Sequence, residues 1–221
     1  MSRFGRLTDE PATFLVTGAR VLDPRAGTDE IRDLAVADGR VVDPGALPAD
    51  APTLDGRGLV AAPGLCDVHT HLREPGAEGA ETIETAARAA ARGGFTTICA
   101  MPNTEPPLSE PYRVAWVESR GADAACRVRV VGAVTRDRDG QALADLATLA
   151  GAGVVGFSDD GASVASARLA RSALASLASL GLPLVEHAEE PTLAASASMR
   201  AGPTAVRLGL AGWPASAEAA I

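Results

Sequence analysis

The chain has 221 residues, of which 47% are hydrophobic and 22% are charged, and this balance excludes a disordered chain, a collagen and a coiled coil. Its 20 basic and 28 acidic residues give a net charge of −8, which argues against nucleic acid and anionic membrane surfaces as partners. Aromatic residues make up only 3%, so a stacking platform for single-stranded nucleic acid is not expected either.

All 20 basic residues are arginine, and the sequence contains no lysine. This excludes every mechanism that needs a lysine side chain, including Schiff-base chemistry, a P-loop and a lysine-derived metal ligand. Three scattered cysteines, Cys66, Cys99 and Cys126, do not form a disulfide framework and are interpreted as small buried residues in a reducing compartment. We expect a cytoplasmic protein without a secretory signal, because the polar segment 1–12 has no apolar core.

The first 60 residues predict a β-rich portion of a small domain. Short apolar runs lie at 14–16, 21–22, 34–36, 41–42 and 59–60. Turn residues separate these runs, and Asp38-Gly39 is a typical hairpin signal. A proline-rich loop is expected over residues 43–52. We take residues 1–60 as one portion and residues 61–221 as another.

After residue 60, apolar runs alternate with alanine-rich helical stretches. Strands are expected at Leu65–Val68, Thr96–Met101, Val128–Val134, Val154–Phe157 and Leu182–Val185. Helices are expected at Glu81–Arg92, Ser109–Arg120, Gln141–Leu149 and Ala165–Leu180. Continuous buried runs that alternate with helices indicate βα units and a parallel sheet. The longest apolar stretch, Leu59–Cys66, is much shorter than the roughly 18 apolar residues of a membrane span.

Two α/β architectures have this alternation of strands and helices, a doubly wound sheet and a (β/α) barrel. A dinucleotide-binding sheet would carry a glycine-rich fingerprint after its first strand, and the sequence there, CDVHTHLREPG, has none. Polar residues instead follow several different strands, as they do at the C-terminal face of a barrel. Residues 61–221 are too few for the roughly 250 residues of eight units, so about five units are expected, either as an open sheet or as a piece of a longer barrel.

All three histidines follow predicted strands. His69 and His71 are two residues apart, so on an extended segment both rings point to one face and make half of a metal site. His187 follows the fifth strand and supplies a third imidazole. A chance His-x-His on a loop, and a capping or core role for His187, are the alternatives; the common position at strand ends favours a metal site.

Three further residues complete the candidate site. Asp160 follows the fourth strand in Ser158-Asp159-Asp160-Gly161, where a carboxylate can bridge two metal ions or simply make a turn. Arg73 lies two residues after His71, so its side chain can point to the same face as the two histidines. Its guanidinium suits a substrate carboxylate, and the alternative is an ordinary surface arginine. Asn103 follows the second strand and can donate to the same carboxylate or form a turn.

Taken together, these residues resemble dihydroorotase, of the longer bacterial type within the amidohydrolase superfamily. The motifs that carry the resemblance are Pro63-Gly64-Leu65, Asp67-Val68-His69-Thr70-His71-Leu72-Arg73-Glu74-Pro75-Gly76, Glu81-Thr82-Ile83-Glu84-Thr85, Met101-Pro102-Asn103-Thr104, Gly156-Phe157-Ser158-Asp159-Asp160-Gly161 and Glu186-His187. The resemblance implies a metal-bearing (β/α)8 barrel beside a small β-sandwich. Residues 1–60 then belong to the small domain and residues 61–221 form the first five or so units of a truncated barrel.

The resemblance also implies reversible hydrolysis of (S)-dihydroorotate to N-carbamoyl-L-aspartate in pyrimidine biosynthesis, with one or two Zn²⁺ ions in the complete site. The residues that match the metal ligands of the family are His69, His71, Asp160 and His187. The residues that match the groups holding the substrate carboxylate are Arg73 and Asn103. The general-base aspartate of the family corresponds to a position beyond Ile221, so no catalytic residue of that kind is expected here and the chain alone is expected to be inactive.

Related hydantoinases, dihydropyrimidinases and allantoinases resemble the chain around His-x-His, but they typically bridge their metals with a carboxylated lysine. The absence of lysine therefore favours dihydroorotase. Two alternatives stay open. One is a non-catalytic dihydroorotase-like partner of aspartate carbamoyltransferase, and the other is a different cyclic-amide hydrolase. A homodimer is a further expectation.

Overall fold

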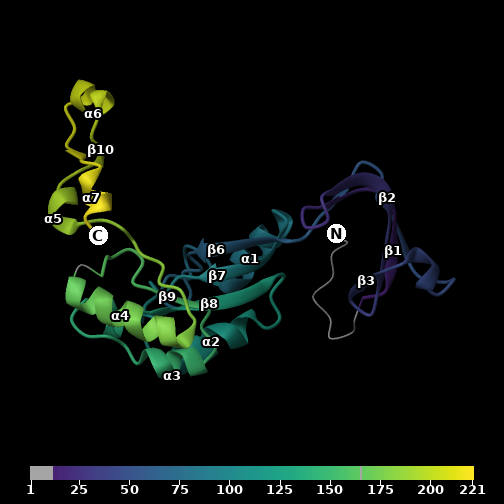
Figure 1. Cartoon of the computed structure of the whole chain (residues 1–221), viewed down its shortest axis with the longest axis horizontal. Coiled ribbons are helices and arrows are strands. Elements are labelled where there is room, and N and C mark those ends of the chain that lie inside the picture. The colour runs from purple at the N-terminus through teal and green to yellow at the C-terminus, as the bar shows by residue number, and fades with distance from the viewer. Residues whose placement is uncertain (1–11, 165) are drawn as a thin grey trace. The chain divides into compact units, whose positions relative to one another are not determined.

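The computed structural model describes residues 12–164 and 166–221 (Figure 1). The chain divides into two compact units, one ending at Leu65 and one beginning at Cys66. The polar segment expected at residues 1–12 lies outside the described residues except for its last residue, and so does residue 165, the first of the fourth expected helix.

The first unit contains one five-stranded sheet. Its strands are β1 (Phe14–Asp23), β2 (Thr28–Ala37), β3 (Arg40–Val42), β4 (Thr53–Asp55) and β5 (Val60–Ala61). The order is β3-β2-β1-β4, and β5 also pairs with β1. The predicted hairpin at Asp38-Gly39 is confirmed, since it joins the antiparallel strands β2 and β3. Both turn residues have positive φ angles, 50° and 71°, as a two-residue type I′ turn requires.

The predicted break between residues 14–16 and 21–22 is wrong, because β1 runs through it without interruption. The register with β2 shifts between Val16 and Ala19, so Gly18 occupies a β-bulge instead of a turn. Gly18 has a φ of 65°, and its N–H donates to the Asp33 carboxylate at 2.9 Å. A glycine accepts this left-handed conformation readily, and the strand can therefore continue past it. The expected proline-rich loop contains one short 3₁₀ turn, η1 (Pro44–Ala46).

The second unit is built on a four-stranded sheet with the order β6-β7-β8-β9. The strands are β6 (Leu65–Thr70), β7 (Phe95–Ala100), β8 (Arg127–Ala133) and β9 (Gly156–Ser158). The helices that alternate with them are α1 (Ile83–Arg92), α2 (Pro111–Gly121), α3 (Leu146–Gly151) and α4 (Ala167–Leu180), with a 3₁₀ turn η2 (Arg136–Arg138) before α3. Strands β7, β8 and β9 run parallel, so the predicted βα alternation is confirmed for the first four units (Figure 1).

The fifth predicted strand, Leu182–Val185, is not a regular strand. Leu184 forms a single parallel bridge to Phe157 of β9, supported by hydrogen bonds from Phe157 N to Pro183 O at 3.0 Å and from Val185 N to Phe157 O at 2.8 Å. Among the described residues, this segment pairs only with β9, and the pairing is a single bridge rather than a ladder of successive pairs. The later elements are α5 (Pro191–Ala194), β10 (Met199–Arg200), α6 (Pro203–Leu208), β11 (Gly212–Trp213) and α7 (Ser216–Ala219).

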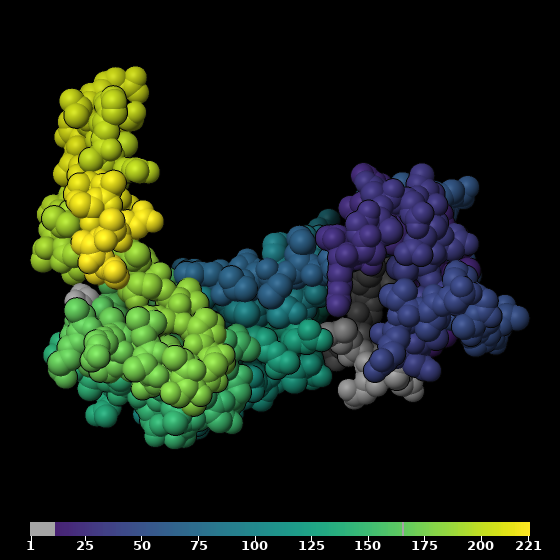
Figure 2. All heavy atoms as spheres, viewed as in Figure 1, coloured from purple at the N-terminus to yellow at the C-terminus, as the bar shows by residue number. Residues whose placement is uncertain are grey.

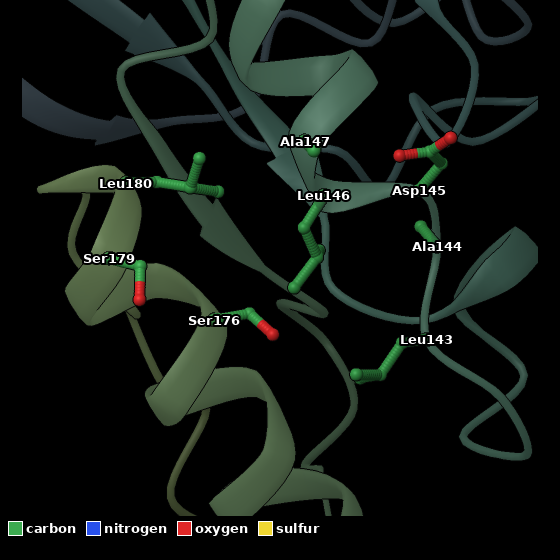
Figure 3. A pocket seen from close by; sticks show the side chains of 8 residues that line it. All are labelled: Leu143, Ala144, Asp145, Leu146, Ala147, Ser176, Ser179 and Leu180. Carbon is green, nitrogen blue, oxygen red and sulfur yellow. The ribbon is translucent and has the colours of Figure 1, made fainter.

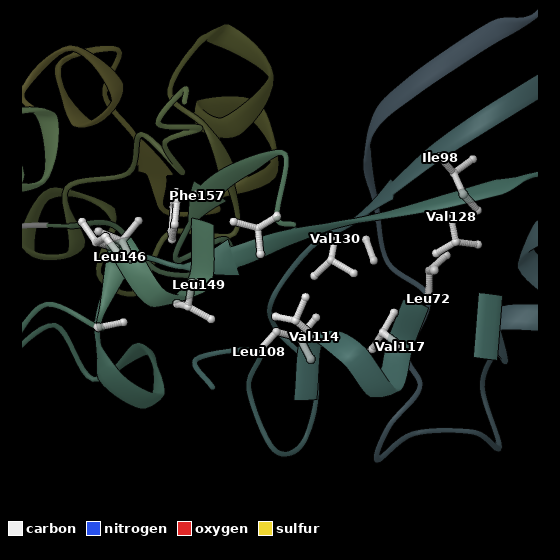
Figure 4. Packing of buried hydrophobic residues seen from close by; sticks show 14 of the residues in the cluster. Leu72, Ile98, Leu108, Val114, Val117, Val128, Val130, Leu146, Leu149 and Phe157 are labelled. Atoms are coloured by element: carbon white, nitrogen blue, oxygen red, sulfur yellow. The ribbon is translucent and has the colours of Figure 1, made fainter. Parts of the chain in front are cut away.

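The core of the second unit lies between the sheet and its helices (Figure 4). Helix α2 buries Val114 and Val117, which are three residues apart and therefore share one helix face. Strand β8 contributes Val130, and β9 contributes Phe157; both side chains are fully buried. Complete burial of such a side chain contributes about 1.5–3 kcal/mol, so these contacts fix how α2 and the strands pack.

A pocket of about 260 Å³ lies between α3 and α4 (Figure 3). Its lining residues are Leu143, Ala144, Asp145, Leu146, Ala147, Ser176, Ser179 and Leu180. None of these is a predicted site residue, and the lining is mostly apolar. The candidate chemistry therefore lies elsewhere in this unit.

Strand β6 leaves one edge of the sheet uncovered. It pairs only with β7 among the described strands, although it carries apolar residues of the kind that are usually buried. Leu65 and Val68 remain 53% and 63% exposed. In the space-filling view, blue-to-teal atoms lie at the surface of the face that is shown (Figure 2). An exposed apolar edge of this kind is a template for pairing with another chain.

We therefore predict that the 221-residue chain, produced by itself, is poorly stable or aggregates. Gel filtration should show large species, and circular dichroism should show a broad thermal transition. The variant Val68→Lys should reduce the aggregation, because a charge at an edge strand opposes strand pairing. A compact monomer that melts cooperatively would contradict this expectation.

Packing of α2 on β8 gives a second prediction. A Cβ atom at Gly121 would lie 2.7 Å from Cβ of Val128, so α2 or β8 would have to shift to accommodate it. Gly121→Ala should therefore lower the free energy of unfolding of the complete gene product by about 1–3 kcal/mol, as overpacking does. Gly151→Ala is the matched control, because no atom lies within 4 Å of its added Cβ. Equal unfolding midpoints for the two variants in urea would refute the tight contact.

Candidate metal centre

The predicted site residues gather at the carboxyl ends of neighbouring strands. His69 lies near the end of β6, and His71 follows that strand directly. Asp160 comes two residues after the end of β9, and His187 follows the bridge made by Leu184. Because the carboxyl ends of parallel strands meet at one edge of the sheet, residues far apart in the sequence come into contact there.

The carboxylate of Asp160 is the centre of this cluster and is 4% exposed. Its Oδ1 lies 3.2 Å from Nε2 of His69 and 3.4 Å from Nδ1 of His187. Its Oδ2 lies 3.5 Å from Nε2 of His71. One ligand atom each from His69, His71 and Asp160 all fall within 4.8 Å of one another. This spacing suits a group of ligands around a single ion.

Backbone contacts hold the segment that carries Asp160. The Asp160 N–H donates to Oγ of Ser158 at 2.9 Å. The preceding residue, Asp159, is buried, and its Oδ1 accepts from the backbone N–H groups of Val134 at 2.9 Å and Thr135 at 3.1 Å. Its Oδ2 accepts from the Thr135 hydroxyl. Asp159 thus ties the end of β9 to the end of β8, while its neighbour faces the histidines.

Arg138 supports the same turn through its backbone carbonyls. Its Nη2 donates to the backbone carbonyls of both Asp159 and Asp160. Gly161 has a φ of 82°, and a Cβ atom there would lie 3.2 Å from Nη2 of Arg138. Glycine therefore suits this position both in backbone conformation and in space. The guanidinium reaches the backbone of the turn and leaves the Asp160 carboxylate to the imidazoles.

His187 sits in a segment that is fastened to the loop after β9. The Ser163 hydroxyl donates to the carbonyl of His187, and it lies 2.7 Å from the carbonyl of Glu189. Nε2 of His187 lies 3.4 Å from Oε2 of Glu189, on the side of the ring opposite Asp160. Burial raises the pKa of the Glu186 carboxyl, whose Oε1 accepts from Val164 N at 2.9 Å.

The two residues expected to bind the substrate carboxylate, Asn103 and Arg73, lie in different surroundings. Asn103 joins the cluster: its Oδ1 lies 3.1 Å from Nδ1 of His71, and its Nδ2 donates to Oδ2 of Asp160 at 3.2 Å. Arg73 is exposed and forms no hydrogen bond or ion pair through its side chain with a described residue. Five of the six predicted site residues therefore meet, and Arg73 stands apart from them.

Sequence reasoning missed the residues that support the cluster. Asp159 belongs to the motif Ser158-Asp159-Asp160-Gly161, but the sequence does not predict its role as a buried anchor. Arg138, Ser163 and Glu189 carried no signal, because each acts through a contact with a loop that is distant in the sequence. Only the packing of the strand ends brings those loops together.

The donor set fits a divalent metal ion. Among the described residues, the basic side chains within ion-pair distance of the Asp160 carboxylate are the three histidines, and no arginine lies among them. A buried carboxylate needs a compensating charge, and a bound metal ion provides one. Imidazole nitrogen and carboxylate oxygen are also the ligands that Zn²⁺ accepts in proteins.

The sequence profile of dihydro-orotase-like proteins matches residues 58–221. The chain is 42% identical over 207 residues to a dihydroorotase of Solibacter usitatus, and 43% identical over 206 residues to one of Pelotomaculum thermopropionicum. The chain belongs to the dihydroorotase-like family. Each of these matches covers 92% of the chain and 48% of the relative, so the chain spans about half the length of the curated relatives it matches.

Two solved structures share the fold of this chain. An L-hydantoinase (dihydropyrimidinase) from Arthrobacter aurescens matches with a TM-score of 0.68 and 23% identity, over 81% of this chain and 41% of that one. A dihydropyrimidinase from Brevibacillus agri matches with a TM-score of 0.61 and 20% identity, over 80% of this chain and 40% of that one. The predicted partial (β/α) barrel is confirmed. Among the described helices, none is long and apolar enough to cross a membrane.

We predict that Asp160→Ala removes metal from the complete gene product, because it deletes the carboxylate that three imidazoles approach. Elemental analysis of the purified protein should show a near-complete loss. Asp29→Ala is the control, since this carboxylate is exposed and pairs with Arg20 in the first unit. Equal metal content in the two variants would rule out Asp160 as a ligand.

Proposed function

We propose that the complete product of this gene is a zinc-dependent dihydroorotase, which interconverts (S)-dihydroorotate and N-carbamoyl-L-aspartate in cytoplasmic pyrimidine biosynthesis. The observation that carries this function is the buried Asp160 carboxylate surrounded by the imidazoles of His69, His71 and His187. Membership of the dihydroorotase-like family, and relatives named dihydroorotase, support this substrate class.

In this proposal, His69, His71, Asp160 and His187 are the residues that would hold the metal. A bound divalent metal ion supplies Lewis-acid polarisation of the ring amide and makes water a better nucleophile near neutral pH. The contribution of the chain is to hold its ligands in place before the substrate arrives. The anchoring of Asp160 through Ser158 and Asp159 serves this purpose, since a fixed ligand needs no rearrangement during the reaction.

Arg73 is proposed to bind the carboxylate of the substrate. Its exposed guanidinium is available for the two parallel hydrogen bonds that a carboxylate accepts. The loop around it is fixed by Glu74, which is 4% exposed. Glu74 accepts from the backbone N–H of Ile83 at 2.7 Å and pairs with Arg120 at 3.2 Å. An exposed side chain on an anchored loop can orient the anionic ring toward the candidate metal centre.

No general base is assigned to the residues of this chain, in keeping with the resemblance. The two expected assembly partners, aspartate carbamoyltransferase and a second copy of the chain, remain predictions. Co-purification with the transferase tests the first of them. The native mass of the complete gene product in solution tests the second.

We predict that Arg73→Gln lowers kcat/KM for dihydroorotate about ten- to a hundredfold, mainly through a higher KM. The reason is the loss of charge-assisted hydrogen bonds, worth about 1.5–3 kcal/mol. Steady-state hydrolysis by the metal-loaded complete gene product measures the effect. Arg88→Gln, an exposed residue of α1 that lies 4.0 Å from Glu84, is the control.

Two outcomes of the same assay would contradict the proposed function, and each would indicate a different one. Hydrolysis of a hydantoin or of allantoin, with no turnover of dihydroorotate, would indicate a different cyclic-amide hydrolase. Absence of turnover with every substrate, together with co-purification of aspartate carbamoyltransferase, would indicate a non-catalytic partner of that enzyme.

A further inference from the structure

We propose that Asn103 is a positioning residue of the metal centre, beyond any contact that it makes with the substrate. Its amide is inferred to select the tautomer of His71 and to restrain the carboxylate of Asp160. The resemblance to dihydroorotase gives Asn103 only a part in binding the substrate carboxylate. The inferred role rests on the proposed metal centre, so it is tested through metal binding as well as through activity.

The two contacts of the amide determine the state of the imidazole. Oδ1 of Asn103 lies 3.1 Å from Nδ1 of His71, and a carbonyl oxygen can only accept a hydrogen bond. In the neutral ring, Nδ1 therefore carries the hydrogen and Nε2 carries the lone pair. Nε2 is the atom that faces Asp160, at 3.5 Å from Oδ2. The lone pair thus points into the cluster, where a metal ion would accept it.

The contact with Asp160 decides which way the amide is turned. Nδ2 of Asn103 lies 3.2 Å from Oδ2 of Asp160. An ionised carboxylate only accepts hydrogen bonds, so the –NH2 group must face it. The opposite orientation would place the carbonyl oxygen against a carboxylate oxygen, with no hydrogen between them. One amide therefore connects two candidate ligands and leaves each in the form that binds a metal.

The loop that carries Asn103 is held firmly enough for such a role. The Leu108 N–H donates to the carbonyl of Pro102 at 3.1 Å and closes the loop across Asn103. The Glu105 N–H donates to the carbonyl of Pro75 at 3.0 Å, which joins this loop to the one after β6. The histidine and the amide that orients it thus belong to two loops that are tied to each other.

Positioning is compatible with substrate binding. An asparagine side chain has two N–H donors and two acceptor sites on its carbonyl oxygen. The contacts with His71 and Asp160 use one of each, so one donor remains for a substrate carboxylate. The two roles consequently predict different effects of substitution, because only positioning changes the affinity for metal in the absence of substrate.

The test measures Zn²⁺ affinity of the complete gene product by competition with a chelator, without substrate. Asn103→Ala and the similarly sized Asn103→Leu should both weaken Zn²⁺ binding about ten- to a hundredfold, as loss of an orienting partner does. Arg73→Gln is the matched control and should bind Zn²⁺ like the unaltered protein. In the metal-free protein, ¹⁵N shifts of His71 should report the Nδ1–H tautomer, and both tautomers should be populated in the Asn103→Leu variant.

The outcomes separate this inference from the proposed function. Unchanged Zn²⁺ affinity and an unchanged His71 tautomer in both Asn103 variants, with only KM raised, would overturn the positioning role and leave the metal centre intact. An unaltered gene product that binds no Zn²⁺ would overturn the metal centre, and the inference with it. Circular dichroism of each variant identifies a loss of Zn²⁺ affinity that arises from unfolding. In a variant that remains folded, the His71 tautomer then decides whether Asn103 has the positioning role.

Discussion

The buried carboxylate of Asp160 is the constraint on which the rest of the site depends. An anion that is 4% exposed is unfavourable unless hydrogen bonds and a cation compensate its charge. Its side-chain neighbours in the described structure are imidazoles and one amide, and Arg138 binds the backbone carbonyls of the turn instead of the carboxylate. The arrangement therefore makes physical sense as a set of ligands that is completed by a metal ion.

The loops at this edge of the sheet share one pattern: a buried, hydrogen-bonded carboxylate anchors the backbone beside each residue with a proposed functional role. Asp159 anchors the turn after β9, and Glu74 anchors the loop that carries Arg73. Both carboxylates are buried and bonded to backbone N–H groups of a neighbouring element. Each anchor stands next to a residue with a proposed functional role, so the chain fixes the backbone of one residue and leaves the next side chain free to meet a ligand.

The fold and the site differ in how far the sequence could predict them. The alternation of β6–β9 with α1–α4 follows from apolar runs and helical periodicity, which are local signals. Pairing was harder to predict: Gly18 forms a bulge in place of a turn, and Leu184 makes one bridge in place of a strand. Whether a segment becomes a strand depends on the neighbour it pairs with, and the sequence of the segment does not contain that neighbour.

By itself, the sequence determined that His69 and His71 share a face, because alternate residues of an extended chain point the same way. It also excluded every mechanism and metal ligand that needs a lysine side chain, because the sequence contains none. Only the tertiary structure decided that Asn103 contacts both His71 and Asp160, from which it is separated by 32 and 57 residues. The physical reason is that such contacts depend on loop conformations fixed by hydrogen bonds between distant strand ends, which no local pattern encodes.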